Sequence, residues 1–185
     1  MNAKSGRSMR IGGSTVAVLL AVGCASEPRT GSPADASAPA PATEVVAPVG
    51  DDRGRTPWVV NIEELTVNNA DFRSARWTGQ FLQMTVMSLA PGEEIGLERH
   101  DDIDQFLRIE QGRARVVMGR SQESMTFDEQ VEDDWAILVP AGYWHNVINT
   151  GDTALKLYSI YAPPEHRPGT VHATAADSAA DHHHD

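Results

Sequence analysis

The sequence has little cysteine, few basic side chains and no long apolar run, and each shortage excludes a class of protein. A single cysteine among 185 residues excludes an intrachain disulfide framework and a zinc site built from several thiolates. The 15 basic side chains against 26 acidic ones give a net charge of -11, which argues against a nucleic-acid partner. No apolar run reaches the ~20 residues that a membrane-spanning helix needs. Any metal site must therefore use imidazole, carboxylate and amide ligands.

Residues 1–23 have the composition of an export signal, because basic residues without acidic ones precede a short apolar run at 16–22. The lone cysteine follows directly, in Ala21-Val22-Gly23-Cys24. This resembles the lipobox of bacterial lipoproteins, which implies cleavage before Cys24, its lipidation and attachment to a membrane. A plain secretory signal with an incidental cysteine is the alternative. Cleavage would leave 12 basic and 26 acidic side chains, and hence a charge of -14.

The segment 24–56 is expected to be a disordered tether. Residues 25–56 contain seven alanines, five prolines and none of the larger apolar or aromatic residues Leu, Ile, Met, Phe, Tyr and Trp. Such a segment buries too little apolar surface to offset the entropy of ordering it. Ala25 and Ser26 follow the cysteine, and no aspartate does, which in lipoproteins of Gram-negative bacteria implies the outer membrane.

The tail at 165–185 is also expected to be disordered, because it is rich in Ala and Asp. It ends in His182, His183 and His184, and loose binding of a transition metal by these imidazoles is the alternative. The folded domain is therefore predicted at 57–164.

The predicted domain has the pattern of an all-β protein. It contains every Trp, Tyr and Phe, and short β-prone runs alternate there with turn residues. One helical turn is expected near 63–65. A sandwich or barrel of antiparallel strands is predicted, with strands near 58–62, 72–77, 81–89, 105–110, 113–118, 122–127, 136–139, 144–149 and 154–161.

Two clusters of turn residues and metal-ligand side chains lie in this domain, and they consist of Gly92, Glu98, His100, Gln105 and Gly112, followed by Pro140, Gly142, His145 and Asn149. Their spacing resembles the two motifs of the cupin superfamily over about residues 80–162. The resemblance implies an antiparallel cupin jelly-roll barrel. Glu98 stands where the first motif has a histidine, Gln105 where it has a glutamate, and Asp134 where a glycine usually opens the second motif. A similar Glu/His/Gln set occurs in small single-domain cupins labelled mannose-6-phosphate isomerase-like.

The same residues predict a metal site. Glu98 and His100 are two positions apart, so both side chains point to one face of a strand. His145 comes from a distant strand that a jelly roll brings close, and Gln105 begins a strand whose same-face neighbours are apolar. Nitrogen and oxygen donors without sulfur suit Mn, Fe, Zn, Ni or Co. The predicted ligands of this divalent metal are therefore Glu98, His100, Gln105 and His145, which leave two octahedral positions for water or substrate.

Each predicted ligand also has a purely structural interpretation. The two histidines could be hydrogen-bonded core residues, although they are the only histidines between 57 and 164. Glu98 could pair with Arg99 or Arg108, and Gln105 could form a hydrogen bond near the rim of the barrel. The motif glycines are expected to be turn residues.

The sequence indicates the reaction less clearly than the site, because proteins with the same fold have many different functions. The first hypothesis is a metal-dependent isomerase or oxygenase such as a dioxygenase, acting on a small oxygenated, sugar-like substrate, with Glu98 as the alternative base. The second is a non-catalytic metal- or carbohydrate-binding surface module, and the third a structural domain with a vestigial site. Pairing of two copies into a homodimer through exposed strand edges is a further expectation. The candidates for a phosphate clamp are Arg99, Arg108, Arg113 and Arg115.

Overall fold

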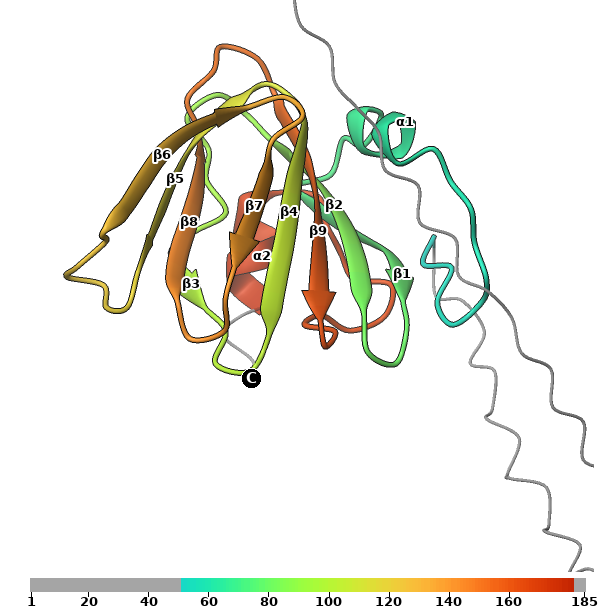
Figure 1. The fold of residues 1–185 in the computed structure, drawn as a ribbon. Helices are drawn as coiled ribbons and strands as arrows, with labels where there is room; N and C mark the ends of the chain where they lie inside the picture. Colours follow the sequence, from blue (N-terminus) through green and yellow to red (C-terminus); the bar gives the residue numbers. More distant parts are fainter. Residues whose placement is uncertain (1–50, 182–185) are drawn as a thin grey trace, which may run out of the picture. The chain divides into compact units, whose positions relative to one another are not determined.

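The computed structural model describes residues 51–181, which form two antiparallel β-sheets that face each other (Figure 1). The larger sheet has the strand order β10-β1-β2-β9-β4-β7, and the smaller has the order β3-β8-β5-β6. This arrangement confirms the expected antiparallel jelly roll. The strands are β1 (Arg73–Thr78), β2 (Gln83–Leu89), β3 (Glu98–Arg99), β4 (Asp104–Gln111), β5 (Arg113–Gly119), β6 (Phe127–Glu132), β7 (Ala136–Val139), β8 (Trp144–Asn149), β9 (Leu155–Ala162) and β10 (Val171–His172).

The side chains that point into the barrel are apolar at one end and polar at the other. On β4, Leu107 and Ile109 are buried in the core cluster, and Gln105 is buried on the same face closer to the β3 end of the barrel. On β9, Leu157 belongs to the core, and Tyr161 lies opposite Gln105 in the pairing of β4 with β9. Burial of the apolar cluster drives the two sheets together, and the polar end holds the groups that carry chemistry.

The N-terminal boundary of the domain differs from the prediction at residue 57. Asp52 is 1% exposed and accepts hydrogen bonds from the backbone N–H groups of Gly54, Thr78 and Gly169. The folded unit therefore includes residues 51–56, which compositional reasoning assigned to the tether because it counted only apolar residues. The rest of the predicted tether and the predicted signal at 1–23 lie outside the described residues.

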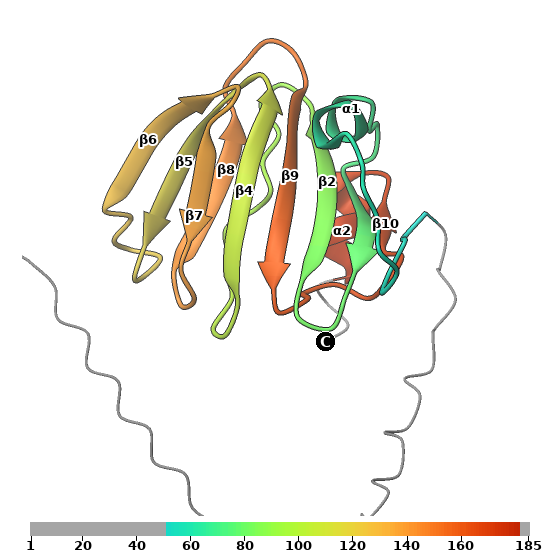
Figure 2. The ribbon, with the colours of Figure 1, turned by 45° about the vertical axis from the view of Figure 1, so that its right-hand side comes forward.

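The strand predicted at 58–62 is wrong, because residues 58–61 have no regular secondary structure and helix α1 (Ile62–Val67) begins at the last of the five positions. The helical turn expected near 63–65 is confirmed as part of this helix. The side chain of Asn61 caps the helix by accepting from the N–H of Glu64, and acidic residues in the first turn favour the helix dipole. The helix packs against β2, β4 and β9, on the side of β2 that Figure 2 shows. Among the described residues, neither helix has the length and apolar character that crossing a membrane requires.

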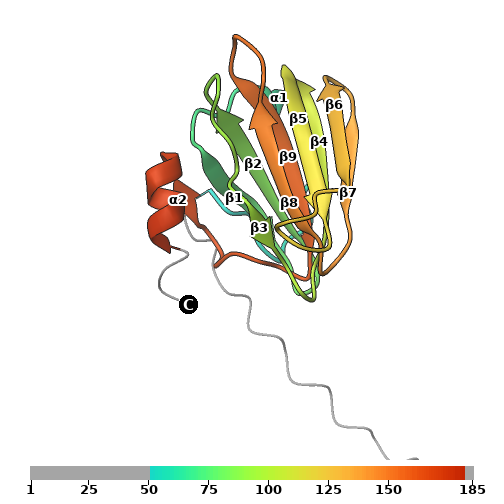
Figure 3. The same cartoon turned by 90° about the vertical axis from the view of Figure 1, so that its left-hand side faces the viewer.

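The prediction of a disordered tail from residue 165 is also wrong for residues 165–181. Val171 and His172 add strand β10 to the edge of the larger sheet, opposite Ser74 and Arg73. Helix α2 (Ala175–Asp181) then lies beside β1 and β3, as Figure 3 shows. Polar contacts hold this helix in place, among them the hydrogen bond between Ser178 and Arg73. A prediction based on the number of apolar residues therefore did not detect the helix. The histidines at 182–184 lie outside the described residues.

Two further details of the strand prediction need correction. The segment 122–127 is the turn of the hairpin between β5 and β6, with Ser121 bridged to Ser124, and the strand begins only at Phe127. The strand that was expected to carry both Glu98 and His100 is only the two-residue β3, and His100 follows directly after it. The strands predicted at 136–139 and 144–149 are confirmed to the residue.

The turn positions of the two motifs behave as expected. Gly92, Gly112 and Gly142 all have positive φ angles, which glycine adopts without strain. Asp134, which replaces a glycine usual in the second motif, also has a positive φ of 71°. Asn149 donates to the carbonyl oxygens of Leu89 and Thr153 and accepts from the N–H of Gly151, so it satisfies backbone groups at the end of β8.

A candidate metal centre inside the barrel

Glu98, His100 and His145 converge at the polar end of the barrel. The carboxylate Oε1 of Glu98 lies 3.5 Å from Nε2 of His100 and 3.3 Å from Nε2 of His145. The three ligand atoms lie within 4.8 Å of one another, and no other such group of His, Cys, Asp or Glu occurs among the described residues. Strand pairing produces this arrangement, because Glu98 of β3 lies opposite His145 of β8. The structure therefore brings three of the four predicted ligands together in one cluster that could hold a metal ion, and their binding of a metal remains a prediction.

The backbone fixes the orientation of the His145 ring. Nδ1 of His145 lies 3.2 Å from the carbonyl oxygen of Tyr143, which can only accept a hydrogen bond. The proton of a neutral ring is therefore held on Nδ1, and Nε2 presents its lone pair to Glu98 and His100. This is the tautomer that a metal ligand needs, with its second nitrogen held by a backbone carbonyl.

A second carboxylate fixes the ring of His100. Nδ1 of His100 lies 3.4 Å from Oε1 of Glu165, on the side of the ring opposite to Glu98. Burial lowers the pKa of His100, but the carboxylates of Glu165 and Glu98 outweigh it and raise this pKa to about 9. His100 thus carries a proton at neutral pH while no metal is bound. A metal would displace the proton on Nε2, and the Nδ1–H would remain directed at Glu165.

Glu98 is ionised in this setting. Burial raises the pKa of its carboxyl group, but the close approach of the His100 and His145 rings and the positive charge of Arg73 bring the pKa well below its usual range. The predicted alternative, an ion pair with Arg99 or Arg108, is wrong. Arg99 pairs with Asp101, and Arg108 pairs with Glu110 and Asp134.

Gln105 lies on the interior face of the larger sheet. Its Nε2 donates to the hydroxyl of Ser159 at 3.0 Å, and its Oε1 is buried without a hydrogen-bond partner among the described residues. Tyr161, its neighbour across the strand pair, packs edge-on against the ring of His100 at 5.9 Å between centroids. Burial raises the pKa of Tyr161, so its phenol remains protonated. The coordination of a metal by Gln105 as a fourth ligand remains a prediction.

The chemistry of these residues fits a metal ion. Among the described residues, the buried polar atoms without a hydrogen-bond partner include one from each of the four predicted ligands, namely Glu98 Oε1, His100 Nε2, Gln105 Oε1 and His145 Nε2. Leaving buried polar atoms unsatisfied costs roughly 1–3 kcal/mol each, so their concentration at one end of the barrel indicates a bound group. Imidazole nitrogens with carboxylate and amide oxygens are the donors that first-row divalent metals accept.

Sequence reasoning missed two residues of this site. Glu165 was assigned to the disordered tail, and only its acidic character near the end of the last predicted strand could have suggested a role. Arg73 lies in a predicted strand, and a charged residue among apolar and small ones is a signal that could have been used. Neither residue belongs to a motif, because both act from the sheet opposite His145.

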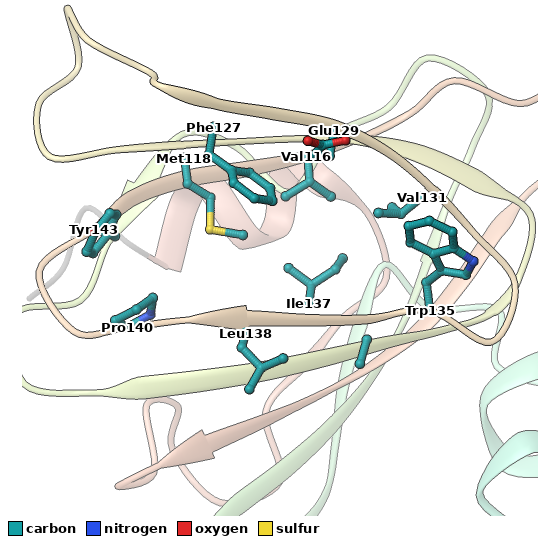
Figure 4. Close-up of a pocket in the computed structure, with 11 residues that line it drawn as sticks. Val116, Met118, Phe127, Glu129, Val131, Trp135, Ile137, Leu138, Pro140 and Tyr143 are labelled. Atoms are coloured by element: carbon teal, nitrogen blue, oxygen red, sulfur yellow. The ribbon is translucent and has the colours of Figure 1, made fainter.

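A second hollow of about 520 Å³ opens between β5, β6 and β7 and is mainly apolar (Figure 4). Tyr143 lines this hollow, and so do the partly exposed Phe127 and Trp135. Glu129 is the only ionisable carboxylate among its lining residues. This pocket therefore offers apolar contact rather than metal ligands.

Comparison with known proteins agrees with the fold. A family model described as a cupin domain matches residues 85–161. The uncharacterized protein YrkC of Bacillus subtilis (strain 168) is 61% identical over 129 residues, which cover 70% of this chain and 69% of that protein. The uncharacterized protein L612 of Acanthamoeba polyphaga mimivirus is 39% identical over 115 residues, which cover 62% of this chain and 70% of that protein.

Similarity extends to a solved structure. The crystal structure of BH2720 from Bacillus halodurans matches with a TM-score of 0.70 and 58% identity, covering 71% of this chain and 99% of that chain. The matched region makes up nearly all of the Bacillus halodurans chain, so in that protein it folds without long flanking segments.

Proposed function

The chain belongs to the cupin domain family, and we propose that it binds one divalent transition-metal ion through Glu98, His100 and His145, with Gln105 as a fourth ligand. The observation that carries the proposal is the convergence of three buried ligand atoms, two of them on imidazole rings whose orientation is fixed. Tyr143 fixes His145 through its carbonyl oxygen. Four ligands of this kind leave two positions of an octahedral ion for a substrate.

We further propose that the metal serves an isomerase or oxygenase reaction on a small oxygenated substrate. The ion supplies a Lewis acid that polarises a carbonyl group or stabilises an enediolate. The low pKa of Glu98 makes it a weak base and a good anionic ligand, so the ligand role is favoured over the alternative base. Tyr161, with its raised pKa, can donate a hydrogen bond to a substrate oxygen beside His100.

A phosphate group on the substrate has no support from the four arginines considered for it. Arg99, Arg108 and Arg115 are engaged by acidic partners away from the triad, and Arg113 is exposed on β5. A substrate without phosphate is therefore the better proposal, and the label of a mannose-6-phosphate isomerase is not adopted.

Metal analysis tests the proposal directly. The chain, with alanine at His182, His183 and His184 to remove the tail imidazoles, is loaded with Mn, Fe, Co, Ni or Zn, dialysed and subjected to elemental analysis. We expect about one ion per chain, and a loss to about a tenth of that in His100→Ala and His145→Ala. His172→Ala is the matched control, because it removes a buried imidazole outside the cluster. Absence of bound metal under every loading condition would contradict the proposal.

We also propose that the protein is exported and anchored to the cell envelope through lipidated Cys24, at the outer membrane if the organism is Gram-negative. The support is the basic and apolar pattern of residues 1–23 with the cysteine directly after it. Mass spectrometry of the protein from a bacterial host should show a diacylglyceryl group on Cys24. In Cys24→Ser this group should be absent and the protein should leave the membrane fraction. Membrane association that is unchanged in the variant would contradict the anchor.

A further inference from the structure

Arg73 is a buried cation that the metal proposal does not use. It is 0% exposed and lies on β1, opposite Met87 of β2 and His172 of β10. Its Nη1 donates to the hydroxyl of Ser178 on α2 at 3.0 Å. Its Nε and Nη2 are buried without a hydrogen-bond partner among the described residues. A buried guanidinium with two unsatisfied donors is strongly unfavourable, so this edge of the side chain indicates a missing anion.

Geometry connects the guanidinium to the metal triad through its hydrogen-bond partner Ser178. Glu98 and Ser178, the partner of Arg73, line one cavity of about 390 Å³ between β3 and α2. Helix α2 contributes Ala175, Ser178 and Ala179 to the wall of this cavity. A ligand that reaches the triad through this cavity would therefore contact the surroundings of Arg73.

The two unsatisfied nitrogens define the shape of the missing group. Nε and Nη2 lie on one edge of the planar guanidinium and match the two oxygens of a carboxylate. Arg115 shows this pairing elsewhere in the same protein, because its Nε and Nη2 bind the two carboxylate oxygens of Asp128 at 2.8 and 2.7 Å. The same edge of Arg73 is buried, so a carboxylate bound there would be shielded from water and held more strongly.

Charge leads to the same conclusion. A divalent ion held by the carboxylate of Glu98 and two neutral imidazoles leaves one excess positive charge, which the carboxylate of Glu165 beside His100 offsets. Arg73 adds a further positive charge in the interior of the barrel, which is costly, and an anionic ligand would offset it. A neutral ligand of the same size would leave the guanidinium uncompensated.

We propose that the site takes a small carboxylate-bearing ligand, whose carboxylate is bound by Nε and Nη2 of Arg73 while a second oxygen of the ligand faces the Glu98, His100 and His145 triad. This inference rests on the proposed metal function and specifies the class of its substrate. Arg73 is then a specificity-determining residue, and Ser178 of α2 is a positioning residue that holds it.

Matched acids and amides test the inference. The protein is loaded with Co²⁺, its metal content is measured, and calorimetry follows binding of glycolate, lactate and 3-hydroxypropionate and of their neutral amides. We expect at least one acid to bind about tenfold more tightly than its amide. Arg73→Gln should remove this preference and leave the affinity for the amide within about twofold. Arg115→Gln is the control, because its carboxylate-binding edge is exposed and already paired.

The outcomes separate the two proposals. Failure to retain metal contradicts the metal function, and the acid–amide comparison on metal-free protein then tests Arg73 alone. Retained metal with equal affinities for acids and amides overturns the inference, whatever the variants do. If Arg73→Gln does not fold, Arg73→Lys keeps the charge without the two-nitrogen edge, and an unchanged preference for acids in that variant also overturns it.

Discussion

Nδ1 of His100 lies 3.4 Å from Oε1 of Glu165, three residues after the end of β9. The carboxylate holds the imidazole so that Nε2 points at Glu98 and His145. A ligating histidine that donates its other N–H to a carboxylate is a stronger and better oriented ligand than a free one. Glu165 is therefore part of the metal site through His100, although it does not contact the metal position itself.

Glu165→Gln should weaken metal binding without removing it. The amide keeps the size of the side chain but loses the charge that supports the Nδ1–H of His100, and such partners are worth about 10–100-fold in metal affinity. Competition with a chromogenic chelator at fixed pH measures the change. Glu63→Gln, an exposed acid on α1, should leave the affinity unchanged. Equal affinities in Glu165→Gln and the parent would show that the ion pair has no role in metal binding.

Titration of metal-free protein should show an unusually basic His100. Its pKa is raised to about 9 from an ordinary value of 6.5, and NMR of the imidazole measures it. Because the folded state binds this proton more tightly than the unfolded state, the stabilisation is full below about pH 6.5 and is lost as the pH rises through about 9. It amounts to at most roughly 3 kcal/mol in the free energy of unfolding.

Denaturant unfolding at a series of pH values measures this loss. His100→Gln should lack the component between pH 6.5 and 9, and metal-loaded protein should lack it too, because the ion displaces the proton. A pKa of His100 near its ordinary value would contradict the ion pairs with Glu98 and Glu165.

The parts of this site that could be predicted from sequence lie close together along the chain. The spacing of Pro140, Gly142 and His145 reflects one turn and one strand, so local geometry nearly determines it. Glu98 and His100 are likewise two positions apart, and their convergence with His145 followed from the resemblance to a known pair of motifs.

The residues that could not be predicted depend on long-range pairing. Arg73 contacts Ser178, which is 105 residues later, through a single hydrogen bond that no periodicity reveals. A role for Glu165 was not predicted, because the Ala- and Asp-rich composition of its segment indicates disorder when only the burial of apolar residues is considered. The tail is ordered to Asp181 by polar anchors, among them the contact of His172 with Asp181, and such anchors have no compositional signal.

Asp52 should be the most important of these polar anchors. It accepts hydrogen bonds from the N–H groups of Gly54, Thr78 and Gly169, and so joins three segments that are distant in sequence. Asp52→Ala would leave these buried donors without a partner and should lower the free energy of unfolding by about 2–4 kcal/mol. Asp51→Ala is the matched control, because Asp51 is an exposed neighbour that pairs only with Arg76 among the described residues.

The role of Asp52 can also be measured locally, at the amide of Gly169. If Asp52 ties the segment around Gly169 to β1, hydrogen exchange at the Gly169 amide should accelerate in Asp52→Ala and remain slow in Asp51→Ala. Loss of that tie would loosen the chain between β9 and β10, which includes Glu165, so metal affinity should fall as well. Unfolding free energies of the two variants within about 0.5 kcal/mol of each other would show that residues 51–56 are not an integral part of the domain.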